Sequence, residues 1–511
     1  MATIYTGRKK ALTGCLPVEM QFPGYVGDTL DETTIAREVA ASLAVHRKNA
    51  ADHAGLKDIF LGRQAILNRD PKDRRADNRV VVNFAQAFTR DITGYSYGSG
   101  IQYVARDASK IEAVQKLNDM MAAESKNAIN KSMGDNQSIG GRGFIAALPD
   151  SLEQNGVPFE LIDLDPETTE VVYSTYNANV PVFAYTHFEG TKDGKKAYVW
   201  KIWTATRCYT VTSADANLKR GVMVMNNVFH LNGEDVVLPY TPNLIGEIPI
   251  VEYRNNQFGL GDWECAVSLF DAINSMASDS LNDVEQAVVS YLALFGVDFD
   301  TNDTEGLKAM RQNRLLVFNG APGINQDAKF VTSQLDGESA NQLRAYFEAA
   351  LKVVVGIPDR DTGQAGSDTG VSAQIRTGSG DLEIVAQNKC LYTVAAERRL
   401  LRVILKILEL SKKGLGIEAS DIDVEIPRSK TDNLQSKVQA GATMYGMNMA
   451  LVDIAKAMDL STDMAGMVSR WESNIQEANA KAAEMTQSKT PEVTADGDGS
   501  SGDGTEEVPD R

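Results

Sequence analysis

The chain has 511 residues, of which 43% are apolar and 23% are charged, and its formal net charge is -18. This length and composition indicate a folded protein of roughly three domains, and the acidity argues against a protein that grips nucleic acid along a broad basic face, which requires clustered Lys and Arg. No apolar stretch reaches the roughly 18 residues of a transmembrane helix, and no apolar segment follows the basic residues near the N-terminus. We therefore expect no membrane span and no signal peptide, and a protein made and kept in a cytoplasm.

The residue types that usually carry catalysis or bind metals form no recognisable pattern. The cysteines are widely separated, the histidines lack metal-ligand spacing, and neither a Walker-type phosphate loop nor a GxSxG motif is present. The glycine-rich run at residues 94–100 follows a predicted helix and is interpreted as a turn. Two carboxylate pairs, Asp163/Asp165 and Asp359/Asp361, lie in acidic loops without a His or Cys companion and are interpreted as solvated. We predict no enzyme activity, no metal and no cofactor.

The N-terminal half of the chain changes from helical to β-rich patterning. Residues 1–30 are punctuated by Gly and Pro and are expected to form an arm, residues 32–67 have helical spacing, and a second helix is expected to end near Gly94. From residue 143 to 251, short β-branched and aromatic runs alternate with Gly, Asn and Asp, which predicts a series of strands. The runs are FIAAL, FELIDL, EVVYS, PVFAYTHF, AYVWKIW, CYTVT and VMVMNNVFHL.

A long helix is predicted from Asp262, as its N-cap, to Phe295. Its apolar residues recur three or four positions apart, so one stripe of the helix is apolar while the other faces are polar. A single apolar stripe requires a partner helix or a neighbouring subunit, and an unbroken helix of this length would measure about 50 Å. The polar positions of interest are Asp271, Asn274, Asp279, Asn282, Asp283 and Glu285.

A small mixed insert is predicted at residues 296–338. It contains a short helical piece near residues 305–311 and two strands, RLLVF and KFVTS, which are separated by a turn. Ser339 and Gln342 then form a capping-box pattern, which predicts that Ser339 caps a second helix. That helix is expected to stop at Gly356, because a Gly followed by Pro is typical of a helix C-terminus.

The Gly- and Asp-rich segment at residues 356–372 is predicted to be a mobile loop between two helices. Its residues alone leave two interpretations open, an ordinary surface loop and a movable element at a restricted site. A third helix, broken or bent near Gly378 and Gly380, is expected to run to Gly414. The strand DIDVEIP and three short helices at residues 433–485 are expected to follow. The acidic tail, residues 486–511, is expected to be disordered.

Three stretches of the chain form a recognisable series. Residues 76–103 hold an Asn-containing lead into a helix and a GYSYGSGIQY ending, without the Pro of the pattern GYxxGxPIxY. Residues 246–286 hold a Pro-Ile-Val-Glu strand, an Asn-Asn pair and a Gly-Asp-Trp-Glu helix start. Residues 353–375 hold an IPD sequence followed by DTGVSA, where SGxA is commoner. In their order and spacing, these stretches resemble the portal proteins of tailed bacteriophages, specifically the siphophage-type family, over roughly residues 35–475.

The resemblance implies an α+β fold of the portal type, with a helical stem and crown, a β-rich wing and a small α/β clip, assembled as a ring of twelve subunits around a channel. The parts then map onto this sequence as a flexible N-terminal arm (1–30), the wing (31–261), a stem helix (262–295), the clip (296–338), a second stem helix (339–355), the tunnel loop (356–372), a long helix with a return to the wing (373–432), the crown (433–485) and a disordered acidic tail (486–511).

The resemblance also implies a function and a set of partners. The ring would occupy one capsid vertex of the virion after assembly in the bacterial host cytoplasm, and double-stranded DNA would pass through it, without sequence specificity, during packaging and ejection. Its expected partners are further copies of the chain, the terminase large subunit, head–tail adaptor proteins, and the major capsid and scaffolding proteins. The implied tunnel-loop residues are Asp359, Arg360, Asp361, Thr362, Gln364 and Asp368, and the implied clip residues for partner docking are Lys308, Arg311, Arg314 and Lys329.

The acidic balance suggests how such a channel would work. A lining of carboxylates repels phosphates and lets DNA slide, while Arg360 and Arg376 would give transient contacts. Two alternatives remain at this point. Another head-completion or capsid-associated protein is commonly much shorter, and a DNA-acting nuclease requires clustered carboxylates with a Lys on adjacent strands, a pattern that the sequence does not display.

Overall fold

The computed structural model describes most of the chain between residues 35 and 447. The described ranges are 21–22, 35–70, 77–153, 155–174, 180–192, 194–231, 234–288, 291–295, 315–318, 327–331, 337–358, 379–428 and 434–447, with short pieces between residues 449 and 481. The chain divides into two units, Met1–Asn433 and Leu434–Arg511, which are described separately. Within the described residues, none of the helices combines the length and apolar character needed to cross a membrane.

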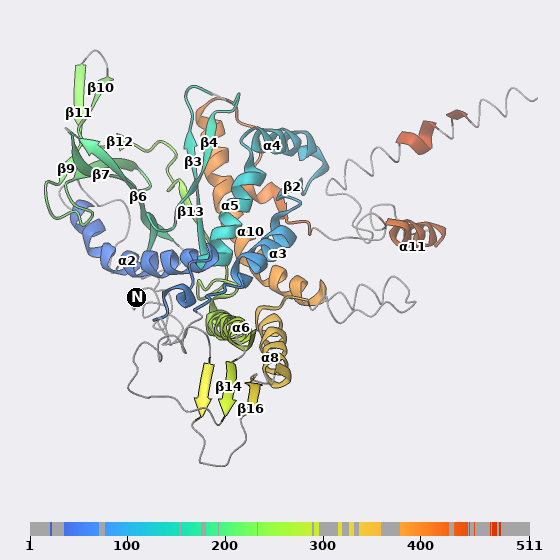
Figure 1. Cartoon of the computed structure of the whole chain (residues 1–511). Helices are drawn as coiled ribbons and strands as arrows, with labels where there is room; N and C mark the ends of the chain where they lie inside the picture. Colours follow the sequence, from blue (N-terminus) through green and yellow to red (C-terminus); the bar gives the residue numbers. More distant parts are fainter. Residues whose placement is uncertain are drawn as a thin grey trace, which may run out of the picture. The chain divides into compact units, whose positions relative to one another are not determined.

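A seven-stranded sheet forms one side of the first unit (Figure 1). Its strand order is β1-β5-β6-β7-β8-β12, with β9 paired to β8, and only the pair of β1 and β5 is parallel. The strands are β1 (Gln21–Phe22), β5 (Thr169–Ser174), β6 (Pro181–Lys192), β7 (Lys195–Trp203), β8 (Arg207–Ser213), β9 (Met223–Val224) and β12 (Thr241–Pro242). Helix α2 (Ile35–Phe60) packs Val39 and Leu43 against Trp200 and Tyr185 of this sheet.

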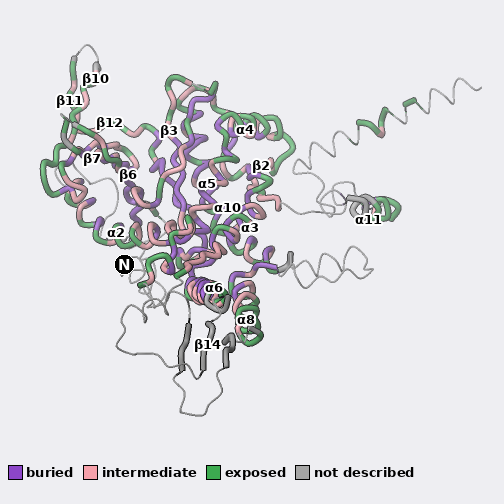
Figure 2. Tube along the Cα trace, in the orientation of Figure 1, coloured by how far each residue is buried: buried purple, intermediate pink, exposed green. Residues whose placement is uncertain are grey.

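The centre of the first unit is a helical core with a second, smaller sheet (Figure 2). The sheet has the order β13-β3-β4, and β17 pairs with β2 beside it. Helix α10 contacts this sheet, and its Leu400, Leu401 and Ile404 belong to the hydrophobic core there. The elements are β2 (Gln102–Ala105), β3 (Arg142–Pro149), β4 (Phe159–Leu164), β13 (Ile250–Arg254), β17 (Ile422–Glu425), α3 (Phe84–Tyr97), α4 (Ile111–Ala123), α5 (Lys126–Gly140) and α10 (Ser379–Leu410).

The strands predicted between residues 143 and 251 are confirmed. All seven apolar runs fall in strands, and VMVMNNVFHL divides into β9 and β10 (Asn227–Leu231). Strand β10 pairs with β11 (Glu234–Leu238) as a separate two-stranded hairpin. The α+β fold class is therefore supported by mixed helices and open sheets.

The predicted long helix is shorter than expected. Glu264–Ala266 form a short 3-10 helix, helix α6 spans Val267–Val288, and Tyr291–Phe295 form strand β14 instead of a last helical turn. Strand β14 is the central strand of a three-stranded sheet with β15 (Leu315–Phe318) and β16 (Asp327–Val331). A strand with neighbours on both sides takes a continuous apolar run such as YLALF, which periodicity alone does not separate from helix.

Two predicted helix caps are also wrong. Helix α8 spans Gly337–Val355, so Ser339 lies inside its first turn instead of capping it. Asp262 does not begin α6, because its carboxylate is bonded to Lys389 and Asn255 and the 3-10 helix begins after Trp263. The bend expected near Gly378 and Gly380 is not a break within α10, which begins at Ser379 and runs unbroken to Leu410.

Other expectations meet the structure only in part. The helix expected to end near Gly94 continues to Tyr97. In the second unit, α11 (Leu434–Gly446) is the first of the three short helices predicted there. The helical piece near residues 305–311 and the acidic tail lie outside the described residues.

Candidate functional site

Helix α6 binds an extended segment of its own chain through a row of polar side chains. Asn274, Ser278 and Asn282 are buried and lie four residues apart. The Asn282 Oδ1, Ser278 Oγ and Asn274 Oδ1 atoms accept hydrogen bonds from the backbone N–H groups of Asn78, Val80 and Val82, at 2.7, 2.9 and 2.8 Å. We call these three side chains the α6 polar row.

The spacing of the α6 polar row explains why it fits an extended backbone. Four helical residues rise about 6.0 Å, and two residues of an extended chain rise about 6.6 Å. Every second N–H of residues 78–82 therefore meets the next acceptor along the helix. The row acts like the neighbouring strand of a sheet, because it accepts hydrogen bonds from part-buried backbone N–H groups of the extended segment.

Two further polar residues of α6 also contact this part of the chain. Asp279 Oδ1 lies 3.2 Å from Arg69 Nη1, and Glu285 Oε2 accepts a hydrogen bond from Asn78 Nδ2 at 2.5 Å. Asp271 and Asp283 are half-buried. Of the six polar residues singled out on this helix, four thus hold residues 69–82 in place: Asn274, Asp279, Asn282 and Glu285.

The apolar stripe of α6 has one buried end and one exposed end. Phe270 and Ile273 are buried in a core that includes Leu351 and Val355 of α8. Toward the C-terminal end of α6, Leu281 is exposed. Among the side chains of these helices that the structure describes, the large exposed apolar ones are Leu281 and Val284 on α6 and Leu343, Tyr346, Val353 and Val354 on α8.

The predicted loop and clip residues are mostly outside the described part of the chain. This holds for all six tunnel-loop residues and for Lys308, Arg311 and Arg314. Lys329 lies in β16, opposite Ala293 of β14. Gly356, the first residue of the predicted loop, follows the end of α8 with a φ of 73°, and a Cβ placed there would meet Val385 Cγ2 of α10 at 2.9 Å.

Two buried carboxylates fix helix α10 to the core. Glu397 is fully buried, and its Oε1 accepts hydrogen bonds from Lys126 Nζ at 2.7 Å and from the Tyr253 hydroxyl at 2.9 Å, while its Oε2 accepts one from the Tyr103 hydroxyl at 2.8 Å. Burial lowers the pKa of Lys126 and raises the pKa of both tyrosines. About two turns earlier in α10, Lys389 Nζ lies 2.8 Å from Asp262 Oδ2, next to the start of α6. Such pairs are costly to break, because the remaining charge stays buried.

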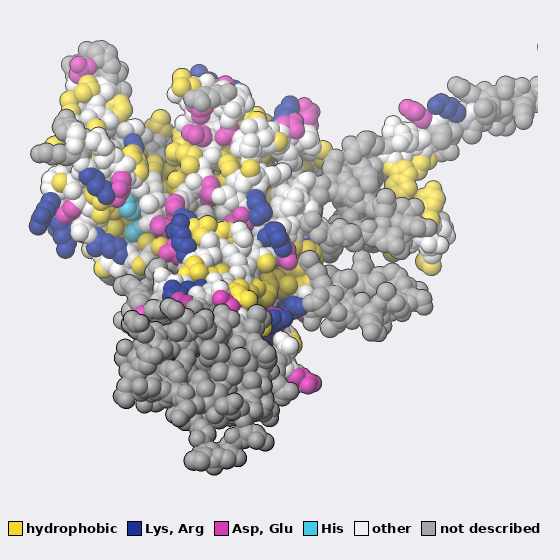
Figure 3. Space-filling view, in the orientation of Figure 1, with side chains coloured by type: hydrophobic (Ala, Val, Ile, Leu, Met, Phe, Trp, Pro, Cys, Tyr) yellow, Lys and Arg dark blue, Asp and Glu magenta, His cyan; other side chains and the backbone are white. Residues whose placement is uncertain are grey.

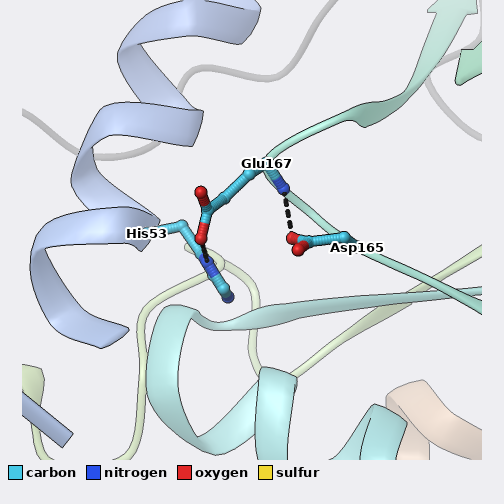
Figure 4. A group of neighbouring side chains, drawn as sticks. All are labelled: His53, Asp165 and Glu167. Carbon is cyan, nitrogen blue, oxygen red and sulfur yellow. Dashed lines mark hydrogen bonds and ion pairs between the residues drawn. The ribbon is translucent and has the colours of Figure 1, made fainter. Parts of the chain in front are cut away.

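Among the described residues, one group of side chains has the spacing of a metal site (Figure 4). It consists of His53 on α2 and of Asp165 and Glu167 in the turn between β4 and β5, with ligand atoms within 4.8 Å of one another. This corrects the expectation that Asp165 has no histidine companion, because His53 lies 112 positions earlier and sequence order does not reveal the contact.

The two carboxylates of this group already form ion pairs with Lys57. Lys57 Nζ lies 3.2 Å from Asp165 Oδ2 and 3.0 Å from Glu167 Oε1. The His53 imidazole and the Lys57 ammonium hold the pKa of Glu167 at about 2. The Lys57 ammonium lies next to both carboxylates, where a divalent ion would bind. These residues therefore fit an ion-pair link between α2 and the β4–β5 turn better than they fit a metal centre.

The comparison with known families identifies one match. A family model described as phage portal protein, SPP1 Gp6-like, matches residues 43–481, which is most of the chain. No curated protein matches the sequence.

Proposed function

Because the chain belongs to the SPP1 Gp6-like family of phage portal proteins, we propose that it forms a dodecameric ring at one capsid vertex and that DNA passes through the central channel during packaging and ejection. A portal protein is a structural component of a bacteriophage particle, and we infer that this chain acts as a passive conduit without an enzymatic site. The match over residues 43–481 is the observation that carries the proposal.

We assign the described elements to the parts of a portal. In this assignment the seven-stranded sheet and α2 belong to the wing, α6 and α8 are the two stem helices, and β14, β15 and β16 belong to the clip. Residues 356–372 form the tunnel loop, and residues 433–485 form the crown. The first stem helix thereby shortens to Val267–Val288.

Exposed apolar side chains support contacts between copies at the stem. Val353 and Val354 of α8 are 81% and 50% exposed, and Val284 of α6 is 51% exposed. Apolar groups gathered on neighbouring helices usually mark an interface. With a net charge of -18 on every copy, burial of such surface is the favourable term that offsets repulsion between subunits.

The proposed partners follow from the positions of the parts in the ring. The clip residues Lys308, Arg311, Arg314 and Lys329 are proposed to dock the terminase large subunit and afterwards the head–tail adaptor proteins. The major capsid and scaffolding proteins would surround the ring in the virion. The force for packaging then comes from the terminase motor, because the chain carries no Walker-type nucleotide site.

Electron microscopy of the purified protein tests the proposal most directly. Rings with a central hole and a mass of about twelve subunits are the expected result. Monomers would contradict it, and monomers that cleave DNA in a metal-dependent manner would favour the nuclease. A second test addresses the acidic channel, because phosphates adhere to basic surfaces. Changing Asp359, Asp361 and Asp368 together to Lys should reduce DNA filling of heads.

A charge-matched control separates the channel from general acidity. The control changes three tail residues to Lys: Asp496, Asp498 and Asp503. It alters the net charge by the same amount outside the proposed channel, and DNA filling should stay normal. Equal filling by both triple variants would contradict an acidic, DNA-repelling channel.

A further inference from the structure

A hairpin at the edge of the wing exposes apolar residues on one face. Strands β10 and β11 form a separate two-stranded sheet that projects from the seven-stranded sheet (Figure 1). Val228 lies directly opposite Val237, so both side chains point to the same face. They are 64% and 56% exposed. A two-stranded hairpin is at best marginally stable in water, so this one is expected to gain from a partner.

Further apolar residues lie on the segment that leads into the hairpin. Val222, Met223 and Met225 are exposed, and Met223 begins β9 beside it. Hydrophobic side chains cover much of the visible surface of the projecting hairpin (Figure 3). We call Val222, Met223, Met225, Val228 and Val237 the hairpin patch. Methionine adapts its shape readily, which suits a contact surface.

The same chain carries an apolar groove elsewhere on the first unit. It has a volume of about 650 Å³ and lies between the loop joining β3 and β4, the segment after β12 and the C-terminal end of α10. Leu244 and Leu410 on its walls are 75% and 50% exposed. Trp203 and Cys208 of the large sheet also line it.

The groove and the hairpin carry charges of opposite sign. Lys201 lines the groove and donates to Thr210 Oγ1, and Asp235 is exposed on the hairpin. The acidic residues at the groove are engaged within the chain: Asp150 accepts a hydrogen bond from the Leu152 N–H, and Glu153 pairs with Lys413 at 2.6 Å. An acidic hairpin can therefore approach Lys201 without facing an uncompensated carboxylate.

We propose that the hairpin patch of one copy fills the groove of the next copy. Because the two surfaces lie at different places on one chain, this contact is heterologous, and repeating it generates a ring or an open helix instead of a closed pair. The apolar character of both surfaces supplies an attraction that holds despite the acidity of each copy. This contact adds a subunit interface to the proposed ring. It rests on the proposed function, because only a ring closes the series of repeated contacts.

A disulfide trap tests the contact in the full chain. Cys208, which lines the groove, and the exposed Cys265 are changed to Ser, and Val228→Cys and Leu244→Cys are introduced together. Oxidation should then give a ladder of covalently linked subunits, whereas each single variant should not. Monomers with an internal disulfide, or no disulfide in assembled rings, would overturn the inference.

Charged substitutions give an independent test. Val228→Glu with Val237→Glu should raise the protein concentration needed for assembly by about tenfold or more, because two apolar side chains are no longer buried. Val180→Glu with Phe188→Glu is the matched control, since both are also exposed apolar residues of the wing (48% and 51%) but lie outside the hairpin patch. Circular dichroism checks that all variants fold.

The outcomes separate this inference from the proposed function. If the unaltered chain forms no oligomer, the ring itself is refuted. If rings form, and the double glutamate variant assembles as readily as the control, the ring stands and the hairpin contact is refuted.

Discussion

Replacing Ser278 by Ala tests the α6 polar row. The Ser278 hydroxyl accepts the Val80 N–H at 2.9 Å and donates to the Asn274 carbonyl at 2.7 Å. Without it, the Val80 N–H loses its partner on the helix in a part-buried setting, where an unsatisfied donor costs about 1–3 kcal/mol. The higher helix propensity of Ala returns about 0.5 kcal/mol. We expect a net loss of about 1–2 kcal/mol in the free energy of local opening.

Hydrogen exchange resolved to single residues measures this effect. In the unaltered chain, the amides of Asn78, Val80 and Val82 should exchange more slowly than those between them, because alternate N–H groups meet the row. In Ser278→Ala, exchange at Val80 should accelerate roughly 5- to 30-fold. Leu281→Ala is the control, since Leu281 is 45% exposed on the same helix. Equal protection of all five amides, or an equal effect of the control, would refute the reasoning.

Three further predictions concern the core of the first unit. Glu397→Gln should lower the free energy of unfolding by about 3–5 kcal/mol, because Lys126 stays buried without its carboxylate, and adding Lys126→Met should recover part of the loss in denaturant titrations. Burial, with the neighbouring His46, lowers the pKa of His187 to about 4. As the pH drops, His187 is therefore protonated in the unfolded chain at a higher pH than in the folded chain. The free energy of unfolding should fall as the pH drops from about 6.5 to 4. His187→Phe should flatten that decline in pH-dependent thermal unfolding; an unchanged slope would contradict it. Gly141→Ala should lower the free energy of unfolding, measured by denaturant titration, by at least about 1–2 kcal/mol, because the φ of Gly141 is 79° and a Cβ there would meet a backbone oxygen at 1.9 Å. Gly94→Ala is the control, since Gly94 has open space around it and the change should not destabilise α3.

The parts of the fold that follow a simple period were predictable. The strands between residues 143 and 251 carry alternation and turn residues, and all seven predicted runs are strands. The end of α6 was not predictable in this way. The run at residues 291–295 is apolar at every position, and its strand conformation depends on β15 and β16, whose partner residues lie more than 20 positions away.

Helix α5 shows the opposite problem. Its sequence, KNAINKSMGDNQSIG, is polar, yet Lys126, Asn130 and Gln137 are buried. The reason lies in distant partners such as Glu397, which is 271 residues away from Lys126. A pattern search expects polar residues outside, and only the folded chain reveals that their partners are inside.

The candidate site was predictable as a helix but not as a set of contacts. The polar residues of α6 stand out in the sequence, and Asn274 and Asn282 were singled out as positions of interest. Their partners at residues 78–82 lie about two hundred positions earlier, and an extended segment that bonds side chains leaves no periodic signal. The capping role expected for Asp262 failed for the same reason, because Lys389 competes for its carboxylate.

The end of α8 and the start of α10, which flank the proposed tunnel loop, pack in one hydrophobic core. Val355 and Ile357 at the end of α8 lie in the same core as Leu382 near the start of α10, and Gly356 faces Val385 at a distance that leaves no room for a larger residue. The core also contains Phe270 of α6. The described residues that flank the loop, at the end of α8 and the start of α10, are therefore anchored to the helices that we assign to the stem. In a ring, a shift of the stem helices would move these two flanks together, whereas a motion confined to the loop would leave this core intact.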